Sequence, residues 1–554
     1  MSQKQIWHRV YPEGIPAQIE IPSVSLYYLI EQAAASYPDN PAILFLNHQL
    51  TYGRLKEQVD RFAAALHVLG VKKGDRVAIL MPNCPQIVVS YYAVARLGAV
   101  TVLVNPLYTE RELAYQLKDA GAETIVFLDQ LQPKVMNVLP DTAIQRVIST
   151  GIPQYLALDL SQAAGDVPVA AENGMLSFEV LLQAHPPTPP QAALDPANDL
   201  ALLQYTGGTT GVVKGAMLTH KNLVDNVIQT RYWLNNCQEG TERFFCVLPF
   251  FHAFAMTTCM NLSIYLSAAM ILIPRLEVMN LLKQIDRYRP TIFQGVPSLY
   301  VAVIASPEVK NYELSSIKSC LCGGAPLPAE VQQQFEAITG AKLVEGYGLT
   351  EASPVTHCNP VFGERVNGSI GLPLPNTEIK IMDLETGTRE LPPGEAGELC
   401  IKGPQVMKGY WNMPEETAQV LRDGWLYTGD IARMDERGFT YIVDRKKDMV
   451  ISMGYNVYPR EVEEVLYEHP AVKEAAVIGV QDRNRGEILK AFVVLKEGAE
   501  AKREEMIKFC RRYLAQYKIP KQIEFRSELP KSSVGKILRR VLVEEEKAKV
   551  KAKQ

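Results

Sequence analysis

Short apolar runs alternate with amphipathic segments along the first half of the chain. Arg76–Met81, Thr101–Asn105 and Thr124–Leu128 are as short and apolar as buried strands, while Cys84–Leu97 and Glu110–Ala120 have helical spacing. Strands separated by helices pair in parallel, because each crossover returns the chain to the same edge of the sheet. The alternation therefore predicts an α/β fold with doubly wound sheets.

A different pattern begins after Asp444. The predicted elements there are helix Glu461–His469, strands Ala475–Val480 and Ala491–Leu495, and helix Arg503–Tyr517, with a solvated helical tail over Glu544–Gln554. Such a set would form an α+β unit of roughly one hundred residues, which is an ordinary domain size. We therefore predict an N-terminal domain over residues 1–444 and a C-terminal domain over residues 445–554.

Composition narrows the function classes. A chain of 554 residues should divide, because single cores stop growing near ~250–300 residues. Its 57 Lys and Arg against 61 Asp and Glu give a net charge of −4, which offers no global attraction for nucleic acid. Nine scattered cysteines do not make a disulfide framework and indicate a reducing compartment, so we expect a cytoplasmic protein.

One stretch is long enough to raise the question of a membrane span. From Phe244 to Pro274 no residue carries a formal charge, counting His252 as neutral. The stretch nevertheless contains Pro249 and several hydroxyl side chains, and its best apolar run, Met260–Ile273, has only 14 residues. We expect a buried helix or the wall of an apolar ligand cavity, and at most peripheral membrane contact.

The most informative segment is YTGGTTGVVKG, which begins at Tyr205 and follows an apolar strand. Its candidate phosphate donors are Thr206, Gly207, Gly208, Thr209, Thr210, Gly211 and Lys214. Glycines let several backbone N–H groups converge on one anion, and threonine hydroxyls and a lysine add donors and charge. Because Gly215 follows Lys214, the segment is not a Walker A loop. It predicts a polyphosphate site, with a flexible connector as the alternative.

Three later segments carry weaker signals. In DGWLYTGDIARMDERGFTYIVDRKKD, one carboxylate, Asp430, can accept from both hydroxyls of a ribose, and Arg445 offers a planar fork for oxygen atoms. In EGYGLTE, Tyr347 beside Gly346 can stack on a base, and Glu351 can bind Mg²⁺ together with phosphates. In PKSSVGKILRR, Lys536 can neutralise charge in a transition state. Each alone is also compatible with an ordinary turn.

In this order the four segments resemble the adenylate-forming superfamily of acyl-CoA synthetases, standalone adenylation domains and firefly luciferase. The resemblance extends from Leu50 to Lys536, and Asp423–Glu463 is most similar to the fatty acyl-CoA synthetases. It implies a large N-terminal domain with doubly wound sheets and a small mobile α+β C-terminal domain, hinged near residues 445–447.

The resemblance also implies roles for single residues. Thr206–Lys214 would hold the β- and γ-phosphates of ATP, although Gly207 replaces the usual Ser or Thr and Val213 the usual Pro. Thr350 would contact the α-phosphate, and Glu351 would bind magnesium, joined by Thr206.

Further roles follow in the same way. Tyr347 would stack near adenine, facing a wall made by Gly323, Gly324, Ala325 and Pro326, and Asp430 with Arg445 would hold the ribose. Lys447 matches the hinge position, and Lys536 matches the lysine that bridges the carboxylate and the α-phosphate. His252, within PFFHAF, matches a motif bordering the acyl pocket, although core packing is the ordinary reading of such a histidine.

The activity implied is ATP-dependent activation of a fatty acid through an acyl-adenylate, followed by transfer to coenzyme A with release of AMP. Long-chain acids are favoured by overall resemblance, while a medium-chain or aromatic acid remains an alternative. So does a free-standing adenylation enzyme that loads a carrier protein, and, outside catalysis, a lipid-binding module. The resemblance is also compatible with a homodimer.

Overall fold

The computed structural model describes residues 3–160, 174–206, 213–275, 277–452, 455–482, 486–532, 535 and 537–551. The chain folds into two compact units. The larger unit comprises Trp7–Glu378 and Lys402–Gly424, and the smaller unit comprises Met1–Ile6, Ile379–Ile401 and Trp425–Gln554. The predicted boundary near residues 445–447 therefore falls inside the smaller unit, and a rotation at that point stays a prediction.

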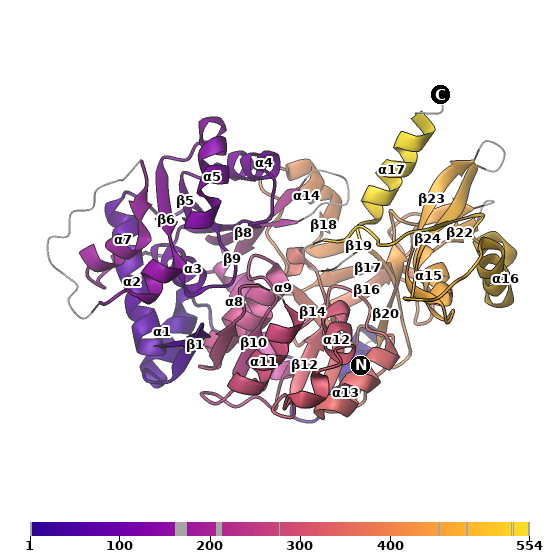
Figure 1. The fold of residues 1–554 in the computed structure, drawn as a ribbon, viewed down its shortest axis with the longest axis horizontal. Helices are drawn as coiled ribbons and strands as arrows, with labels where there is room; N and C mark the ends of the chain where they lie inside the picture. Colours follow the sequence, from indigo (N-terminus) through magenta and orange to yellow (C-terminus); the bar gives the residue numbers. More distant parts are fainter. Residues whose placement is uncertain are drawn as a thin grey trace. The chain divides into compact units, whose positions relative to one another are not determined.

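A seven-stranded sheet begins the larger unit, in the order β7-β6-β5-β3-β4-β8-β9 (Figure 1). The strands are β3 Arg76–Leu80, β4 Val100–Leu103, β5 Thr124–Leu128, β6 Arg146–Thr150, β7 Leu176–Ser177, β8 Leu200–Thr206 and β9 Lys214–Thr219. All neighbours pair in parallel except β8 and β9, which form an antiparallel hairpin. The predicted strand–helix alternation is confirmed.

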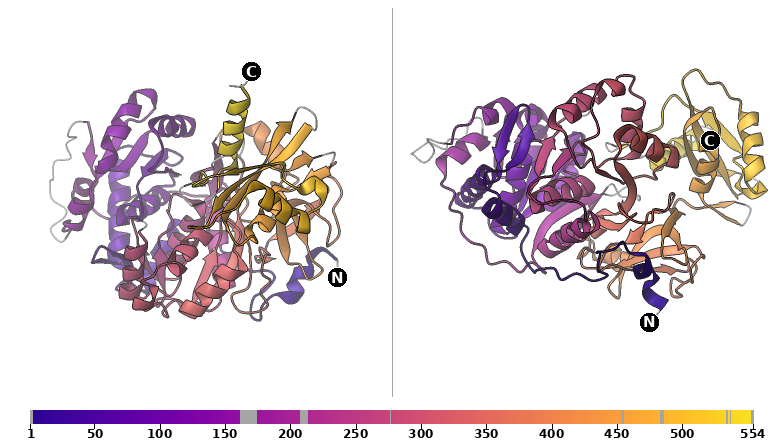
Figure 2. Two further views of the ribbon diagram at one scale, coloured as in Figure 1. Left: turned by 45° about the vertical axis from the view of Figure 1, so that its right-hand side comes forward. Right: turned by 90° about the horizontal axis from the view of Figure 1, so that it is seen from below.

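Helices on both faces bury this sheet. Those of the region are α1 Tyr27–Ser36, α2 Tyr52–Val68, α3 Pro85–Leu97, α4 Glu110–Ala120, α5 Gln132–Val138, α6 Ile152–Leu156 and α7 Phe178–Ala184. Apolar side chains of α4 and α5 form one core with strands β3 to β6 and β8, while α2, α3 and α7 pack together on the other face (Figures 1 and 2). A capping box at Thr109 and Glu112 explains why α4 begins where it does.

Two four-stranded sheets complete the larger unit. One has the order β10-β11-β1-β2, with β10 Arg243–Cys246, β11 Ala269–Leu272, β1 Pro41–Phe45 and β2 His48–Thr51; the other has the order β12-β13-β14-β15, with β12 Ser319–Cys322, β13 Lys342–Gly348, β14 Val355–Cys358 and β15 Leu372–Pro373. The accompanying helices are α8 His220–Trp233, α11 Val278–Tyr288, α12 Pro297–Ile304, α13 Ala329–Thr339 and α14 Pro414–Val420.

The uncharged stretch from Phe244 to Pro274 lies in the core of the larger unit. It forms β10, the short helices α9 Ala253–Ala255 and α10 Leu262–Tyr265, a π-helix over Met256–Asn261, and β11. Its polar side chains are satisfied internally: Thr257 donates to the carbonyl of Ser353 at 2.6 Å, and Tyr92 donates to Asn261 at 2.8 Å. The expected buried segment is thus several elements and not a single helix.

The smaller unit contains two sheets. One contains β16 Glu378–Met382, β17 Gly397–Lys402, β19 Trp425–Met434 and β20 Thr440–Arg445; the other contains β21 Val450–Ser452, β22 Tyr455–Val457, β23 Val472–Asp482, β24 Gly486–Leu495 and β25 Gln522–Phe525. Helices α15 Pro459–Tyr467 and α16 Arg503–Tyr513 cover one face of the second sheet, and α17 Arg539–Lys551 covers the other.

Among the described residues, no helix is long and apolar enough to cross a membrane.

Candidate active site

The predicted phosphate segment connects β8 to β9 along the chain. Thr206 ends β8 and Lys214 begins β9, and the two residues face each other across the ladder. Gly207, Gly208, Thr209, Thr210 and Gly211 lie outside the described residues, so their donor roles stay a prediction. What the structure does place is the base of the segment, where a hydroxyl and an ammonium group stand on paired strand ends.

Close packing fixes that base. Tyr205 is buried and donates a hydrogen bond of 2.6 Å to the Oδ2 atom of Asp119. Its ring covers Gly215, where an added Cβ atom would lie 3.1 Å from the ring. Since any side chain at Gly215 would push Tyr205 aside, the glycine keeps the two strands close just below the phosphate segment.

Glu351 and Lys214 both contact the side chain of Tyr410. The 3₁₀ turn Thr350–Ala352 carries Glu351 just after β13. The hydroxyl of Tyr410 donates to the Oε1 atom of Glu351 at 2.7 Å, and the ammonium of Lys214 lies 5.0 Å from the centre of the Tyr410 ring. Thr350, half-buried, begins the same turn. The structure thus brings together Thr350, Glu351 and Lys214, which are far apart in sequence.

The predicted adenine-binding residues lie together at one edge of the β12-β13-β14-β15 sheet. β12 and β13 are parallel neighbours, so Gly324, Ala325 and Pro326 follow one strand where Gly346 and Tyr347 end the next. Ligands of open α/β sheets bind at such carboxyl edges. An added Cβ atom at Gly346 would lie 2.5 Å from the Cδ1 atom of Leu321, so a larger residue there would displace that side chain. Tyr347 is half-buried and contacts the ring of His357 edge-on.

His252 is held at the start of α9. Its Nδ1 atom accepts a hydrogen bond of 3.3 Å from the backbone N–H of Phe254, which caps the helix. The side chain of Gln204, near the end of β8, donates to the carbonyl of Phe251 at 2.8 Å. The ring of Phe254 packs against Gly323, so closely that a Cβ atom added to this glycine would lie 3.2 Å from the ring. His252 therefore lies in a segment that is fastened both to β8 and to the turn after β12.

The predicted ribose residues lie in the smaller unit and contact each other. Asp430 on β19 pairs with Arg445 on β20, and the Nε atom of Arg445 lies 3.3 Å from Oδ1 of Asp430. The backbone N–H of Asp430 donates to the hydroxyl of Thr428 at 3.1 Å. A carboxylate oxygen in this position can accept hydrogen bonds from hydroxyl donors.

Lys447 lies between β20 and β21 in the smaller unit. Lys447 is half-exposed and its ammonium lies 3.9 Å from Asp448; burial lowers the pKa of Lys447 below its usual value, while Asp448 opposes that shift. Lys536 lies outside the described residues. Of the described residues on either side of it, Leu538 donates its backbone N–H to the carbonyl of Pro530 at 2.8 Å.

The residues present fit a magnesium ion that binds with a nucleotide. Among the described residues, no three His, Cys, Asp or Glu side chains gather into a group that could hold a metal. Magnesium requires no such cage, because one or two carboxylates plus substrate phosphates suffice. Glu351, with one oxygen fixed by Tyr410, is such a carboxylate, and Thr206 supplies a hydroxyl on the strand beside Lys214.

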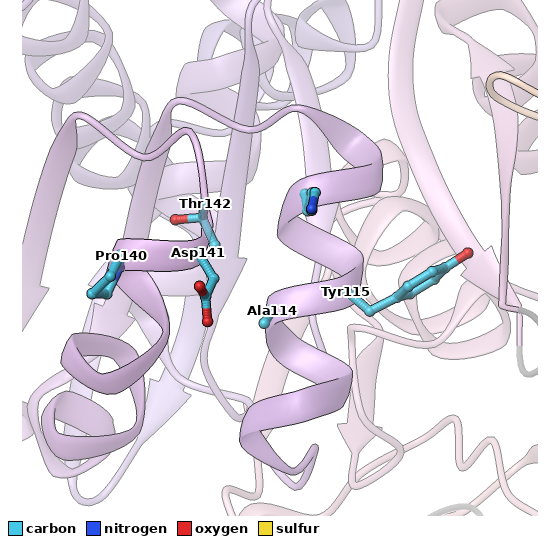
Figure 3. A pocket seen from close by; sticks show the side chains of 6 residues that line it. Ala114, Tyr115, Pro140, Asp141 and Thr142 are labelled. Atoms are coloured by element: carbon cyan, nitrogen blue, oxygen red, sulfur yellow. The ribbon is translucent and has the colours of Figure 1, made fainter.

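A surface hollow of the larger unit lies apart from these residues. It is lined by Ala114, Tyr115, Lys118, Pro140, Asp141 and Thr142, between α4 and the turn that follows α5 (Figure 3). Tyr115 reaches from its rim to donate to the carbonyl of Val213 at 3.3 Å. None of the predicted site residues lines this hollow, so it is not the predicted nucleotide site.

Three residues around the site were not predicted from the sequence. They are Tyr410, which contacts Glu351, Gln204, which contacts Phe251, and Asn83. Buried Asn83 donates to the carbonyls of Cys246 and Leu248 and thereby orients the segment before His252. All three act over long separations in the chain. A Gly-Tyr pair or a lone amide carries no local pattern that would have singled it out.

Comparison with known proteins identifies the family of this chain. Residues 30–411 match the family described as AMP-binding enzyme, and residues 461–536 match its C-terminal domain. A long-chain-fatty-acid–CoA ligase of Bacillus subtilis is 48% identical over 99% of both chains. Among solved structures, ATP-bound MatB from Rhodopseudomonas palustris has a TM-score of 0.83 at 31% identity, covering 94% of this chain and 99% of MatB.

A second solved structure is the anthranilate CoA ligase AuaEII in complex with anthranoyl-AMP. Its TM-score is 0.84 at 27% identity, and the match covers 95% of this chain and 98% of that one. The predicted fold class is confirmed by these matches, which extend over both compact units. The chain belongs to the AMP-binding enzyme family.

Proposed function

We propose that this protein is an AMP-forming long-chain fatty acid–CoA ligase. The carboxylate of the acid attacks the α-phosphorus of ATP, which gives an acyl-adenylate and pyrophosphate, and the thiol of coenzyme A then displaces AMP. The observation that carries the proposal is the meeting of Lys214, Thr206 and Glu351 at the base of the glycine–threonine segment, in a chain of this family. The full-length similarity to a bacterial long-chain ligase supports the choice of acid.

Catalysis in this scheme consists mainly of positioning and of neutralising charge. Lys214 offsets negative charge on the β- and γ-phosphates, Thr350 contacts the α-phosphate, and Lys536 approaches the reacting carboxylate. Asp430 and Arg445 hold the ribose, and Tyr347 lies along the base. Magnesium, when bound at Glu351, supplies further positive charge to the phosphate oxygens.

The buried residues on either side of His252 support an apolar acid. Phe250, Met256, Cys259 and Met260 are all fully buried there, and no formal charge occurs from Phe244 to Pro274. A fatty acyl chain gains about 0.8 kcal/mol for each methylene group removed from water, so longer chains bind such a wall more tightly.

The proposal extends to the cell compartment. All nine cysteines are free and buried, which supports a reducing environment. We propose a cytoplasmic enzyme with at most peripheral membrane contact, in which magnesium is the metal; a homodimer is compatible with this proposal.

Steady-state kinetics with a panel of acids tests the choice of substrate. We expect kcat/KM for acyl-CoA formation to be highest for long-chain saturated acids, lower for medium-chain acids and lowest for anthranilate and 4-coumarate, because each lost methylene weakens binding. A maximum at an aromatic acid would overturn long-chain specificity. Acyl-adenylate formation without any transfer to free coenzyme A would instead favour an enzyme that loads a carrier protein.

A further inference from the structure

The segment from residue 407 to residue 411 lies as an added strand along β9. The backbone N–H of Met217 donates to the carbonyl of Gly409 at 2.8 Å, and that of Trp411 donates to the carbonyl of Gly215 at 2.8 Å. An isolated bridge pairs Tyr410 with Ala216. Tyr410 is therefore carried beside the strand whose first residue is Lys214.

The chain from Gln405 to Trp411, which contains this segment, is also joined to the turn that contains Glu351. The backbone N–H of Met407 donates to the carbonyl of Glu351 at 2.8 Å, and the hydroxyl of Ser353 donates to the carbonyl of Gln405 at 2.8 Å. One short stretch of backbone thus contacts both the phosphate hairpin and the turn with the predicted metal ligand.

Tyr410 has little freedom to move. Its backbone N–H donates to the hydroxyl of Thr417 at 2.8 Å, and its side chain is buried. The preceding residue, Gly409, has a φ of 148°, and a Cβ atom there would lie 2.7 Å from Thr417. Backbone contacts on both sides therefore fix the direction in which the ring and hydroxyl point.

The side chain of Tyr410 makes two different contacts with predicted site residues. Its hydroxyl donates to Glu351 at 2.7 Å, while its ring face lies 5.0 Å from the ammonium of Lys214. Hydrogen bonds to a metal-binding carboxylate fix its orientation, and an aromatic face attracts a cation. Burial and, next in size, the charge of Glu351 raise the pKa of Tyr410 above its usual value.

We propose that Tyr410 is a positioning residue that orients Glu351 toward the metal of a bound metal–nucleotide complex and seats Lys214 against the phosphates. This inference rests on the proposed function, because it takes Glu351 and Lys214 as ligands of magnesium and ATP. Beyond that function, it assigns a different role to each contact of Tyr410. The hydroxyl orients the metal-binding carboxylate, and the ring positions the ammonium group of Lys214.

Binding of α,β-methylene-ATP, which cannot be cleaved at the α-phosphorus, tests this division without any turnover. Calorimetric titrations with Mg²⁺ and with a chelator give the factor by which the metal strengthens nucleotide binding. In Tyr410→Phe we expect this factor to fall about tenfold, as for other residues that orient a metal ligand. Affinity in the chelator should not change, since the ring remains against Lys214.

Two further variants separate the contacts. Tyr410→Leu removes the ring as well, and affinity should then fall even without metal. The matched control is Tyr27→Phe, because the hydroxyl of Tyr27 also donates to a carboxylate, that of Asp60, at 2.7 Å, in a buried place outside the site. In the control both affinities should equal those of the wild type.

A double-mutant cycle guards against a merely structural effect. Glu351→Gln should lose the metal enhancement, and adding Tyr410→Phe to it should cause no further loss, because the two residues act through one contact. An unchanged enhancement in Tyr410→Phe, or an equal loss in Tyr27→Phe, would overturn the role of Tyr410. If the wild type shows no metal-dependent nucleotide binding, the proposed function fails along with it.

Discussion

Asp430 is the clearest single-residue test of the predicted ribose contact. Its carboxylate lies beside Arg445 on the neighbouring strand. We expect Asp430→Ala to raise the KM for ATP by about tenfold to a hundredfold, since hydrogen bonds to a charged group contribute about 1.5–3 kcal/mol. The KM for the fatty acid should change little. Steady-state kinetics at saturating acid measure the effect.

The control for this variant is Asp435→Asn. Asp435 lies in the turn between the same two strands, where it accepts from the backbone N–H groups of Arg437 and Phe439 at 3.0 Å. A rise in the KM for ATP of the same size in both variants would attribute the effect to the hairpin and refute the ribose assignment.

Lys536 has a role in only one half-reaction under the proposed mechanism. Lys536→Ala should lose most acid-dependent pyrophosphate release, because no other cation then bridges the carboxylate and the α-phosphate. Thioester formation from synthetic acyl-adenylate should persist. Lys531→Ala is the control, since Lys531 belongs to the same motif but pairs with Glu474. Equal loss of both half-reactions in Lys536→Ala would be incompatible with its role.

At the scale of elements, the C-terminal helix α17 is anchored through its first two turns. Leu542 is fully buried against the sheet, and Glu546 lies 2.8 Å from the buried ammonium of Lys490. At its first residue, Arg539 pairs with Glu463 and its NH1 atom lies 3.3 Å from Asp448. The helix expected over Glu544–Gln554 is observed as far as Lys551. Glu544 and Lys549 are exposed there, as expected of a solvated tail, whereas Glu546 is held against Lys490.

Arg539 joins that helix to the segment after β20. Removing one partner of a buried ion pair leaves the other charge uncompensated, which costs about 3–5 kcal/mol. We expect Arg539→Gln to speed amide hydrogen exchange in α17 and across residues 444–448 of the intact protein. Arg540→Gln removes only an exposed pair with Glu544 at 3.5 Å and should leave exchange unchanged. Equal exchange in the two variants would show that Arg539 does not anchor the helix.

The limits of sequence reasoning are clearest at this scale. Strands such as Thr124–Leu128 and the helix Glu110–Ala120 were predicted at their observed bounds, because local periodicity records burial. Arg539 and Lys490 gave no such signal, because their partners are distant in the sequence. Glu463 lies 76 residues from Arg539, and Glu546 lies 56 residues from Lys490. Likewise, the family motifs singled out Glu351 and Lys214, but the tyrosine between them contacts Glu351 across 59 residues.

At the scale of the whole molecule, buried histidines make stability depend on pH. Burial lowers the pKa of His220 to about 4, whereas it would be near 6.5 in the unfolded chain. The unfolded state therefore binds more protons below pH 6.5, and stability falls as the pH drops from 6.5 toward 4, by about 3 kcal/mol in full for this group.

His220→Asn tests this dependence. The Nδ1 atom of His220 accepts from the backbone N–H of Leu26 at 3.2 Å, a contact that an amide oxygen can retain. We expect the difference in Tm between pH 7.5 and pH 5 to shrink in this variant and to stay unchanged in His48→Asn, since His48 is exposed. The same pH difference in His220→Asn and the wild type would contradict the assignment.

The family, the enzyme class and the two-unit α/β architecture all support one reaction. In it an acyl group is activated as an adenylate and then transferred to coenzyme A. Isotope transfer tests that claim most directly. A long-chain fatty acid labelled with oxygen-18 in both carboxylate oxygens is incubated with the protein, ATP, Mg²⁺ and coenzyme A, and the products are analysed by mass spectrometry. The account predicts AMP carrying one labelled oxygen alongside acyl-CoA that retains the other, whereas unlabelled AMP, or ADP with the label in inorganic phosphate, would contradict it.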